Sequence, residues 1–471
     1  MFNSKDNSEN SFITQISDIP LLEYNQIFVN NLTWIDRGIE KSVATFDLVV
    51  RDLPENWNFY VFDGLQRFVD ILLQFRFDDR AVQLLKRMNL IDSKKSEEYY
   101  KDLKFSGEVF SMKDGTIFFP GEPIVRITAP IVEANMLTAF LLNVFNYPIR
   151  VLTKSLRVKF ASGPTTFFIG SLARLPGFEQ GYYSIKDAYL LDSPIGNPFL
   201  FRKFPELTPP NTITSNINHA FIKSFPTERQ AFRYFLDVLV EKANFFFVMT
   251  DTYEIKKGLA IFIEEIKKTP NLDRKKMMMT IDSGDLKQLA HYMRKELDKN
   301  GLEEIRIQAM GGLDEYNIDD MVKSKTPIDC YVSATALNNT IDCPVLELVY
   351  KMAELRHEDG IVEQKAKLTI GKESYPGRKQ VFRVYEDGKI SRDIIGLDGE
   401  NLGKPLLEKI IENGKVVAKI PTIEDTKMLL KSEVLTLPES FKTIRSKGNL
   451  YKINISDKLK ILLDEVKVKH L

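Results

Sequence analysis

The segment FFFVMTD at residues 245–251 is a short apolar run that ends in a polar residue. Three similar runs follow it at intervals of about thirty residues, which is near the length of one strand–helix unit. They are MMMTID at 277–282, EIRIQAM at 304–310 and IDCYVS at 328–333. Apolar runs that alternate with amphipathic stretches predict an α/β fold with helices packed around a parallel sheet.

One of the intervening stretches indicates how the sheet is covered. Leu286, Leu289, Met293 and Leu297 are spaced by three or four residues, so they form one apolar stripe on a helix that should end near residue 300. In barrels built from such units, reacting groups lie where strands end. The candidate positions on that argument are Asp251, Asp282, Gly311, Gly312 and residues 333–335.

Length and charge limit the remaining possibilities. A chain of 471 residues predicts more than one domain. We expect an N-terminal α/β domain at 1–150, a barrel at 151–355 and a C-terminal segment at 356–471 that packs with the first domain. Basic and acidic residues number 65 each, so no net charge would attract nucleic acid or an anionic membrane. A small molecule or a protein is the expected partner.

The polar first residues do not resemble a secretory signal, and no apolar run is long enough to span a membrane. The two cysteines, Cys330 and Cys343, lack the spacing of a zinc or redox motif. We therefore expect a cytoplasmic protein with reduced thiols.

Nine strings, read in order, resemble the nicotinate phosphoribosyltransferase family. They are FDLVVRDLP (46–54), FPGEPI (119–124), LLNVFN (141–146), TKSLR (153–157), TDTYE (250–254), IDSGDL (281–286), GGLDE (311–315), DCPVLELVYKMAE (342–354) and SYPGRKQVFR (374–383). Each is weak alone, but their common order extends over nearly the whole chain. The resemblance implies an irregular, open (β/α) barrel of the type II phosphoribosyltransferase kind, with a smaller α/β domain built from both chain ends. It also implies a homodimer with the site near the subunit interface.

The resemblance further implies transfer of a phosphoribosyl group from phosphoribosyl pyrophosphate to nicotinate, which yields nicotinate mononucleotide and pyrophosphate in NAD biosynthesis or salvage. Many family members hydrolyse ATP through a phosphorylated histidine. Positive charge grows on the ribose and negative charge on the leaving group, so carboxylates and Mg²⁺ or other cations must already be in place. The expected small-molecule partners are nicotinate, phosphoribosyl pyrophosphate and ATP, and Mg²⁺ is the expected cofactor.

Position in the family pattern assigns roles to individual residues. His219 matches the histidine that accepts phosphate, while Asp282 and Asp285 match catalytic carboxylates that would also hold the metal. The positions matched to substrate binding are Tyr24, Lys154, Arg157, Asn197, Asp251, Ser283, Gly284, Gly311, Gly312 and Thr335. The match of Tyr24 is one residue out of register.

Several of these residues have a plain structural alternative. Ser283 and Asp285 could cap and neutralise the start of the following helix. The Gly311–Gly312 pair could be an ordinary turn. A histidine such as His219 before an apolar stretch is often structural. Lys154, Arg157 and Asn197 could be solvated or capping residues.

The chain also departs from the family pattern. Leu172 and Thr280 stand where arginines are usual, and VSAT at 332–335 replaces the phosphate loop Gly-Val-Gly-Thr. A hydrogen bond to a charged group is worth about 1.5–3 kcal/mol, so two lost cations predict weak turnover unless Lys154 or Arg174 replaces them. Three hypotheses remain: an active divergent enzyme, a catalytically impaired relative that binds or regulates, and a phosphoribosyltransferase for another base.

Overall fold

The computed structural model describes residues 16–170, 172–194, 198, 202, 205, 214–239, 245–445 and 451–470. The chain divides into two units. Unit 1 combines Met1–Arg150 with Val345–Phe441 and Gly448–Leu471, and unit 2 combines Val151–Pro344 with Lys442–Lys447. Both chain ends contribute to unit 1, as expected. Unit 1 is nevertheless the larger unit and not the smaller one, because it also takes in the strand-rich residues 345–441.

The boundaries differ partly from those expected. The first lies between Arg150 and Val151, where the sequence placed it. The second follows Pro344 and so precedes the expected position at residue 355. The reason is that β12 (Leu348–Arg356) pairs antiparallel with β1 (Val43–Val50) in the main sheet of unit 1.

Unit 2 is an open half-barrel of six parallel strands, which confirms the fold class predicted from the sequence. The strand order is β6-β11-β10-β9-β8-β7. The bounds are β6 (Thr166–Ile169), β7 (Thr214–Ile217), β8 (Phe245–Met249), β9 (Met277–Ile281), β10 (Arg306–Ala309) and β11 (Cys330–Ser333). All five residues of β9 are buried, as expected for a parallel strand that is covered on both faces.

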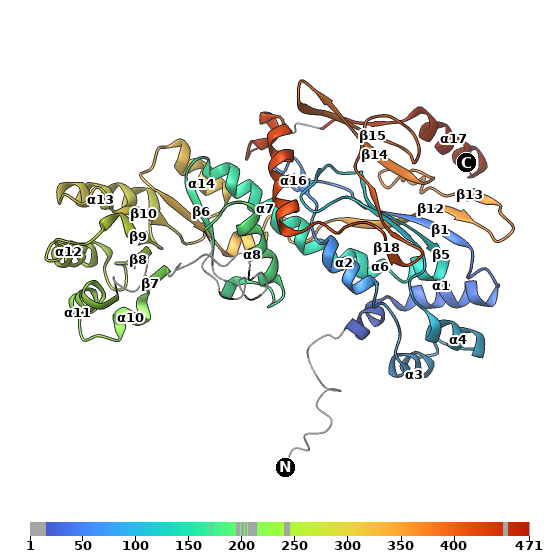
Figure 1. Cartoon of the computed structure of the whole chain (residues 1–471), viewed down its shortest axis with the longest axis horizontal. Coiled ribbons are helices and arrows are strands. Elements are labelled where there is room, and N and C mark those ends of the chain that lie inside the picture. The colour runs from blue at the N-terminus through green and yellow to red at the C-terminus, as the bar shows by residue number, and fades with distance from the viewer. Residues whose placement is uncertain are drawn as a thin grey trace, which may run out of the picture. The chain divides into compact units, whose positions relative to one another are not determined.

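Helices follow the strands of unit 2. Figure 1 shows α12 and α13 along one side of strands β8, β9 and β10. Helix α13 buries Ala290, Met293 and Leu297, which belong to or adjoin the predicted stripe, and it ends at Lys299. The bounds are α7 (Asn146–Ser162), α8 (Gln180–Leu190), α10 (His219–Lys223), α11 (Glu228–Tyr234), α12 (Ile255–Ile266), α13 (Leu286–Lys299), α14 (Glu315–Lys323) and α15 (Thr335–Asn338).

Unit 1 is built on a seven-stranded sheet with the order β13-β12-β1-β5-β3-β17-β18 and a four-stranded sheet with the order β16-β14-β15-β19. Strands β2 and β4 form a separate pair. The remaining bounds are β2 (Tyr60–Val61), β3 (Glu108–Ser111), β4 (Ile117–Phe118), β5 (Pro123–Pro130), β13 (Val362–Gln364), β14 (Lys379–Glu386), β15 (Lys389–Leu397), β16 (Lys404–Pro405), β17 (Glu408–Glu412), β18 (Lys415–Val416) and β19 (Ile453–Ile455).

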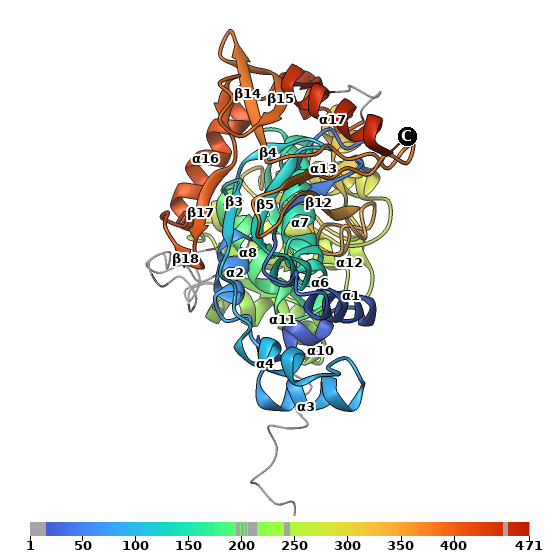
Figure 2. The ribbon, with the colours of Figure 1, turned by 90° about the vertical axis from the view of Figure 1, so that its right-hand side faces the viewer.

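The helices of unit 1 are α1 (Asn25–Asp36), α2 (Leu65–Leu72), α3 (Asp79–Arg87), α4 (Lys94–Asp102), α5 (Ile131–Asn135), α6 (Thr138–Val144), α16 (Ile423–Thr436) and α17 (Asp457–His470). Figure 2 shows α3 and α4 beside each other.

Both cysteines of the chain are buried, free thiols. In the part of the chain that the structure describes, no helix has the length and apolar character needed to cross a membrane.

Candidate active site

One imidazole and two carboxylates meet at the rim of the half-barrel. His219 is the first residue of α10, directly after β7, while Asp251 and Asp282 follow the neighbouring strands β8 and β9. One potential ligand atom from each of the three residues lies within 4.8 Å of the other two. The carboxyl ends of parallel strands meet at one rim, so three consecutive strands bring these side chains together. We call His219, Asp251 and Asp282 the rim cluster.

Short contacts from adjacent loop residues orient the rim cluster. His219 Nδ1 lies 3.1 Å from Thr252 Oγ1, and the hydroxyl of Ser283 donates to Asp251 Oδ2 at 3.4 Å. Asn218 fixes the start of α10, because its side-chain oxygen accepts the backbone N–H of Phe221. The second oxygen of Asp251, Oδ1, is buried and has no hydrogen-bond partner among the described residues. That oxygen is therefore available to a donor or a cation.

The electrostatics of the rim cluster favour added positive charge. Burial raises the pKa of Asp282, and the negative charge of Asp251 raises it further. The charges of His219 and Arg174 act in the opposite direction on the pKa of Asp282 without cancelling the increase. Arg174, which was a candidate to replace a missing arginine of the family pattern, is thus a cation that acts on the rim cluster. A proton or a metal ion would relieve the repulsion between the two carboxylates.

The predicted glycine pair lies against the cluster. Gly311 has a φ of 94°, and a Cβ at this position would lie 2.1 Å from the carbonyl oxygen of Asp282. Only glycine permits this approach and this backbone conformation. Gly312 is exposed and has nothing within 4 Å of its Cβ position. The pair therefore presents open backbone beside Asp282.

Asp285 does not join the cluster, contrary to its predicted pairing with Asp282 at a metal. Helix α13 begins at Leu286, so Asp285 occupies the N-cap position, and its Oδ1 accepts the backbone N–H of Gln288 at 3.1 Å. The capping alternative thus describes Asp285, while Asp251 supplies the second carboxylate. Ser283 contacts Asp251, and Gly284 is an exposed residue of the same loop.

Lys154 and Arg157 lie in a buried ionic group and not at an open surface. Lys154 Nζ is 2.5 Å from Glu315 Oε2 and 2.6 Å from Asp342 Oδ1. Arg157 Nε is 3.0 Å from Glu315 Oε1. Both basic side chains and the glutamate are at most 2% exposed. Their charges are already compensated, so this geometry favours a structural role over the predicted contact with substrate.

A segment from the far end of the chain completes this ionic group. Arg157 Nη2 donates to the carbonyl oxygen of Ile444 at 3.1 Å. The next residue, Arg445, binds Asp319 at 2.9 Å and Asp320 at 3.0 Å, and both belong to α14. Residues Lys442–Lys447 therefore belong to unit 2 although they follow most of unit 1 in sequence.

Thr280, which stands where the family pattern has an arginine, has only uncharged hydrogen-bond partners in the structure. Thr280 is fully buried, and its hydroxyl donates to Gln308 Oε1 at 3.1 Å. Gln308 Nε2 in turn lies 3.8 Å from the sulfur of Cys330. These three residues occupy facing positions on β9, β10 and β11. A hydrogen-bonded neutral row thus replaces the charge that the family pattern has here.

The altered phosphate loop packs against Gly170. A Cβ on Gly170 would lie 2.9 Å from Val332 Cγ1 and 2.8 Å from Ala334 Cβ, so these two side chains fill the space beside the glycine. Ser333 is buried and its hydroxyl donates to the carbonyl oxygen of Leu313 at 2.7 Å. Thr335 begins α15 and is exposed. The side chains that replace the glycines are therefore accommodated within the sheet.

Of the two remaining predicted residues, the structure describes one. Tyr24 precedes α1 in unit 1 and is 59% exposed. It belongs to a different unit from the rim cluster. Asn197 lies outside the described residues.

Sequence reasoning missed a group of basic residues in unit 1. Burial lowers the pKa of Lys351, and the positive charges of Arg51, Lys367 and Lys372 lower it further. None of the four forms an ion pair with a carboxylate in the described ranges. We call them the basic cluster. Their lysine-rich segments were visible in the sequence, but the residues come from β12, the end of β1 and a loop, so no local signal predicts that they meet.

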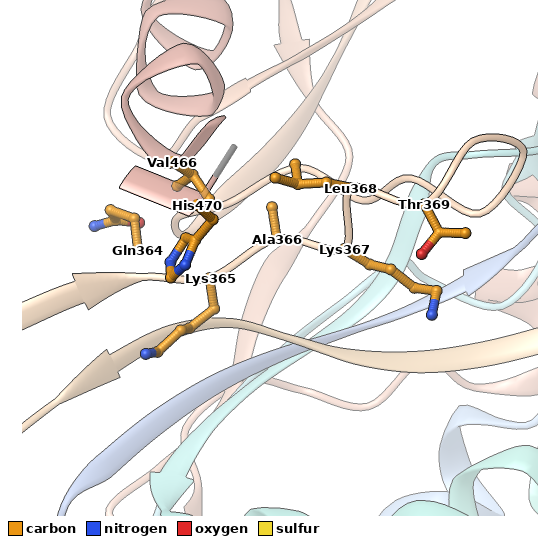
Figure 3. A pocket seen from close by; sticks show the side chains of 8 residues that line it. All are labelled: Gln364, Lys365, Ala366, Lys367, Leu368, Thr369, Val466 and His470. Atoms are coloured by element: carbon orange, nitrogen blue, oxygen red, sulfur yellow. The ribbon is translucent and has the colours of Figure 1, made fainter. Parts of the chain in front are cut away.

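The basic cluster adjoins a hollow of about 620 Å³ through Lys367. Its other lining residues are Gln364, Lys365, Ala366, Leu368, Thr369, Val466 and His470. Figure 3 shows the amines of Lys365 and Lys367 pointing to opposite sides. Lys365 pairs with Glu363, whereas Lys367 belongs to the basic cluster and helps to lower the pKa of Lys351.

The donor set of the rim cluster fits a divalent cation. Two carboxylates are ligands that Mg²⁺ prefers, and the buried oxygen Asp251 Oδ1 has no partner among the described residues. The imidazole nitrogen extends the set to three donors.

The chain is similar to proteins of known families. Residues 31–146 match the nicotinate phosphoribosyltransferase (NAPRTase) N-terminal domain, and residues 403–463 match the nicotinate phosphoribosyltransferase C-terminal domain. The chain is 30% identical to nicotinate phosphoribosyltransferase pncB2 of Mycobacterium tuberculosis, with 90% of this chain and 89% of that protein covered. It is 28% identical to nicotinate phosphoribosyltransferase of Bacillus subtilis, with 92% and 91% covered.

The fold has a counterpart of known structure. The crystal structure of human nicotinic acid phosphoribosyltransferase matches with a TM-score of 0.75 at 20% identity and covers 95% of this chain and 100% of that one. This likeness defines the fold as that of a type II phosphoribosyltransferase. The similarity to the mycobacterial protein goes further: the chain belongs to the nicotinate phosphoribosyltransferase family, which confirms the resemblance read from the sequence.

Proposed function

We propose that this chain transfers the phosphoribosyl group of phosphoribosyl pyrophosphate to nicotinate in NAD biosynthesis or salvage. The observation that carries the proposal is the rim cluster, in which His219 meets Asp251 and Asp282 within a chain of this family. The ring nitrogen of nicotinate forms the new bond to the ribose carbon. The bond from that carbon to oxygen breaks, and its electron pair leaves with pyrophosphate.

His219 is the proposed acceptor of the phosphoryl group of ATP. Its Nδ1 contacts the hydroxyl of Thr252, which holds the ring in one orientation. When Nδ1–H donates to that oxygen, Nε2 carries the lone pair that attacks phosphorus. The bond from the γ-phosphorus to its bridging oxygen breaks in that step, and its electron pair leaves with ADP. Hydrolysis of the phosphorylated histidine then gives phosphate and returns the free imidazole.

Asp251 and Asp282 are the proposed holders of Mg²⁺. A bound Mg²⁺ would neutralise phosphate oxygens and the developing charge of the leaving pyrophosphate. The mutual repulsion of the two carboxylates supports this role, because it raises the cost of leaving the cluster without a cation. Asp282 also lies beside the open backbone of Gly311, where a ribose or phosphate oxygen could approach.

Positive charge for the phosphates has a proposed source within unit 2. Arg174 acts on Asp282 and is exposed, which supports a role near the leaving group. The basic cluster of unit 1 is a separate feature: its four cations have no ion-pair partners in the described part of the chain, which supports binding of an anion by that unit. We also propose a homodimer and a cytoplasmic location, the latter in accord with two free thiols.

The test is to incubate the purified protein with nicotinate, phosphoribosyl pyrophosphate and Mg²⁺, with and without ATP, and to measure pyrophosphate and nicotinate mononucleotide. We expect both products and a faster rate with ATP. The variant His219→Ala should lose the ATP-dependent part of the rate and should not become labelled by ATP that carries a radioactive γ-phosphate. His291→Ala is the matched control, because His291 is exposed on α13.

A different result would favour another hypothesis. Pyrophosphate release with a different base but not with nicotinate would identify another acceptor, which the neutral row at Thr280 makes worth testing. Calorimetric heat from a nucleotide without any product would identify a non-catalytic relative.

A further inference from the structure

Glu228, which the sequence analysis did not single out, is a buried carboxyl group close to the rim cluster. It is the first residue of α11 and is 8% exposed. Its Oε1 is buried and has no hydrogen-bond partner among the described residues. Most buried carboxylates are paired with a base or several donors. A buried carboxylate oxygen without a partner at this position calls for a functional explanation.

The approach of α12 to the end of β8 fixes the place of this carboxyl group. A Cβ on Gly258 in α12 would lie 2.1 Å from the carbonyl oxygen of Thr250 and 3.3 Å from Glu228 Oε1. Glu228 therefore lies against the residue that precedes Asp251. Thr250 Oγ1 and Asp251 Oδ1 are likewise buried oxygens without a partner in the described ranges. Glu228, Thr250 and Asp251 thus each carry one buried oxygen without a partner.

The charges around Glu228 are negative. Burial raises the pKa of Glu228, and the charges of Asp251 and Glu254 raise it further. In the described ranges, no positive charge is among the causes that act on the pKa of Glu228. Each carboxylate added to a partly buried cluster of carboxylates increases the repulsion within the cluster when no cation is bound. The affinity of the cluster for a cation increases as a result.

We infer that Glu228 is a positioning residue for a divalent cation: its buried carboxyl group behind Asp251 increases the affinity of the rim cluster for the metal ion without being one of its direct ligands. The inference rests on the proposed function only in taking Asp251 and Asp282 as the residues that hold the cation. Residues that support metal ligands from behind change affinity by about 10-fold to 100-fold when they are replaced. Glu228 should act at the lower end of that range, because no direct hydrogen bond links it to Asp251.

The experiment measures Mn²⁺ binding to the full chain by electron paramagnetic resonance, without substrates. The variants are Glu228→Gln, Glu228→Asp and Asp251→Asn. The control is Glu264→Gln, because Glu264 is 59% exposed and pairs with Arg229 on the surface. We expect one Mn²⁺ site that Asp251→Asn removes, a dissociation constant raised about tenfold in Glu228→Gln, and a wild-type value in Glu264→Gln. Glu228→Asp keeps the charge and should bind Mn²⁺ more tightly than Glu228→Gln.

Equal affinities of the wild type and Glu228→Gln would overturn the inference, as would Mn²⁺ binding that does not depend on Asp251. If Glu228→Gln does not fold, the comparison moves to Glu228→Asp, whose affinity should then lie between that of the wild type and that of Asp251→Asn; a value equal to that of Asp251→Asn would count against a supporting charge. Product formation is measured separately. If product forms but Mn²⁺ affinity does not depend on Glu228, the proposed function stands and the inference fails. If Mn²⁺ affinity depends on Glu228 but no product forms, the inference stands and the proposed function fails.

Discussion

Asp251 and Asp282 lie just after the adjacent parallel strands β8 and β9, and each offers an oxygen within 4.8 Å of the other and of a ring nitrogen of His219. This pairing of two carboxylates sets the balance between stability and function in unit 2, because the charge of Asp251 adds to burial in raising the pKa of Asp282.

The variant Asp282→Asn should be more stable than the wild type at neutral pH but inactive. The raised pKa of Asp282 means that the folded state binds its proton more tightly than the unfolded state does. Its contribution to stability is therefore full at acid pH and is lost as the pH rises through the raised pKa. Asparagine does not ionise, so the variant keeps this contribution to the free energy of unfolding at neutral pH. Each kcal/mol gained corresponds to a rise of about 2–4 °C in Tm. Thermal unfolding of both proteins at pH 4 and pH 7.5 measures the difference in Tm. A lower Tm at pH 7.5 than that of the wild type would contradict the prediction.

Gly311 and Gly312 form a matched pair for substitution. Gly312→Ala should cost about 1–2 kcal/mol, because alanine tolerates positive φ poorly but meets no atom within 4 Å. Gly311→Ala should cost more and should also lower kcat, because its Cβ would displace the backbone of Asp282. Denaturant unfolding and pyrophosphate release check the two effects. Equal losses of stability and rate in both variants would mean that the close approach to Asp282 has no consequence.

Gly170 and Ala334 should be coupled. Gly170→Ala adds a methyl group beside Ala334 Cβ and Val332 Cγ1, and overpacking of this kind costs about 1–3 kcal/mol. Ala334→Gly restores one of the glycines of the family loop and opens that space. The double variant should therefore be more stable than the sum of the single effects predicts. A double-mutant cycle from denaturant unfolding measures the coupling, and simple additivity would show that the packing is adjustable.

Lys367→Gln should weaken binding of an anion such as inorganic pyrophosphate to the basic cluster of unit 1. The cluster loses one of its charges, and a surface charge contact of about 1 kcal/mol corresponds to a dissociation constant about fivefold higher. The difference should shrink at high salt, because exposed charges are screened. Lys460→Gln is the control, since Lys460 is 58% exposed and pairs with Asp457 on α17. Calorimetric titration measures both variants, and a dissociation constant that does not change at low salt would show that the basic cluster does not bind the anion.

The sequence predicted the half-barrel well because its signal is local. The run of β9 is buried at all five positions, so its residues had to be apolar whatever their neighbours were. The rim residues Asp251 and Asp282 could be predicted for the same reason, since strand ends in a parallel sheet share one edge. His219 required the family pattern, because nothing in its surroundings separates a reacting histidine from a structural one.

The remaining assignments depend on partners that are distant in sequence. Arg157 is 158 positions from Glu315, and only the folded chain reveals that this acid compensates the basic pair. Asp285 was ambiguous because a carboxylate before a helix serves equally as a cap or as a ligand, and the start of α13 at Leu286 decides for the cap. Glu228 gave no signal at all, since its neighbours Thr250 and Gly258 are distant from it in sequence.

The bond from Arg157 to Ile444 and those from Arg445 to α14 also have a consequence for biosynthesis. A growing chain emerges from the ribosome amino end first, so all six strands of the half-barrel exist well before Arg445 is made. Until then Arg157 lacks one of its acceptors, and Asp319 and Asp320 lack their guanidinium. The half-barrel therefore reaches its final set of bonds only after residues 334–445 have followed the last of its strands.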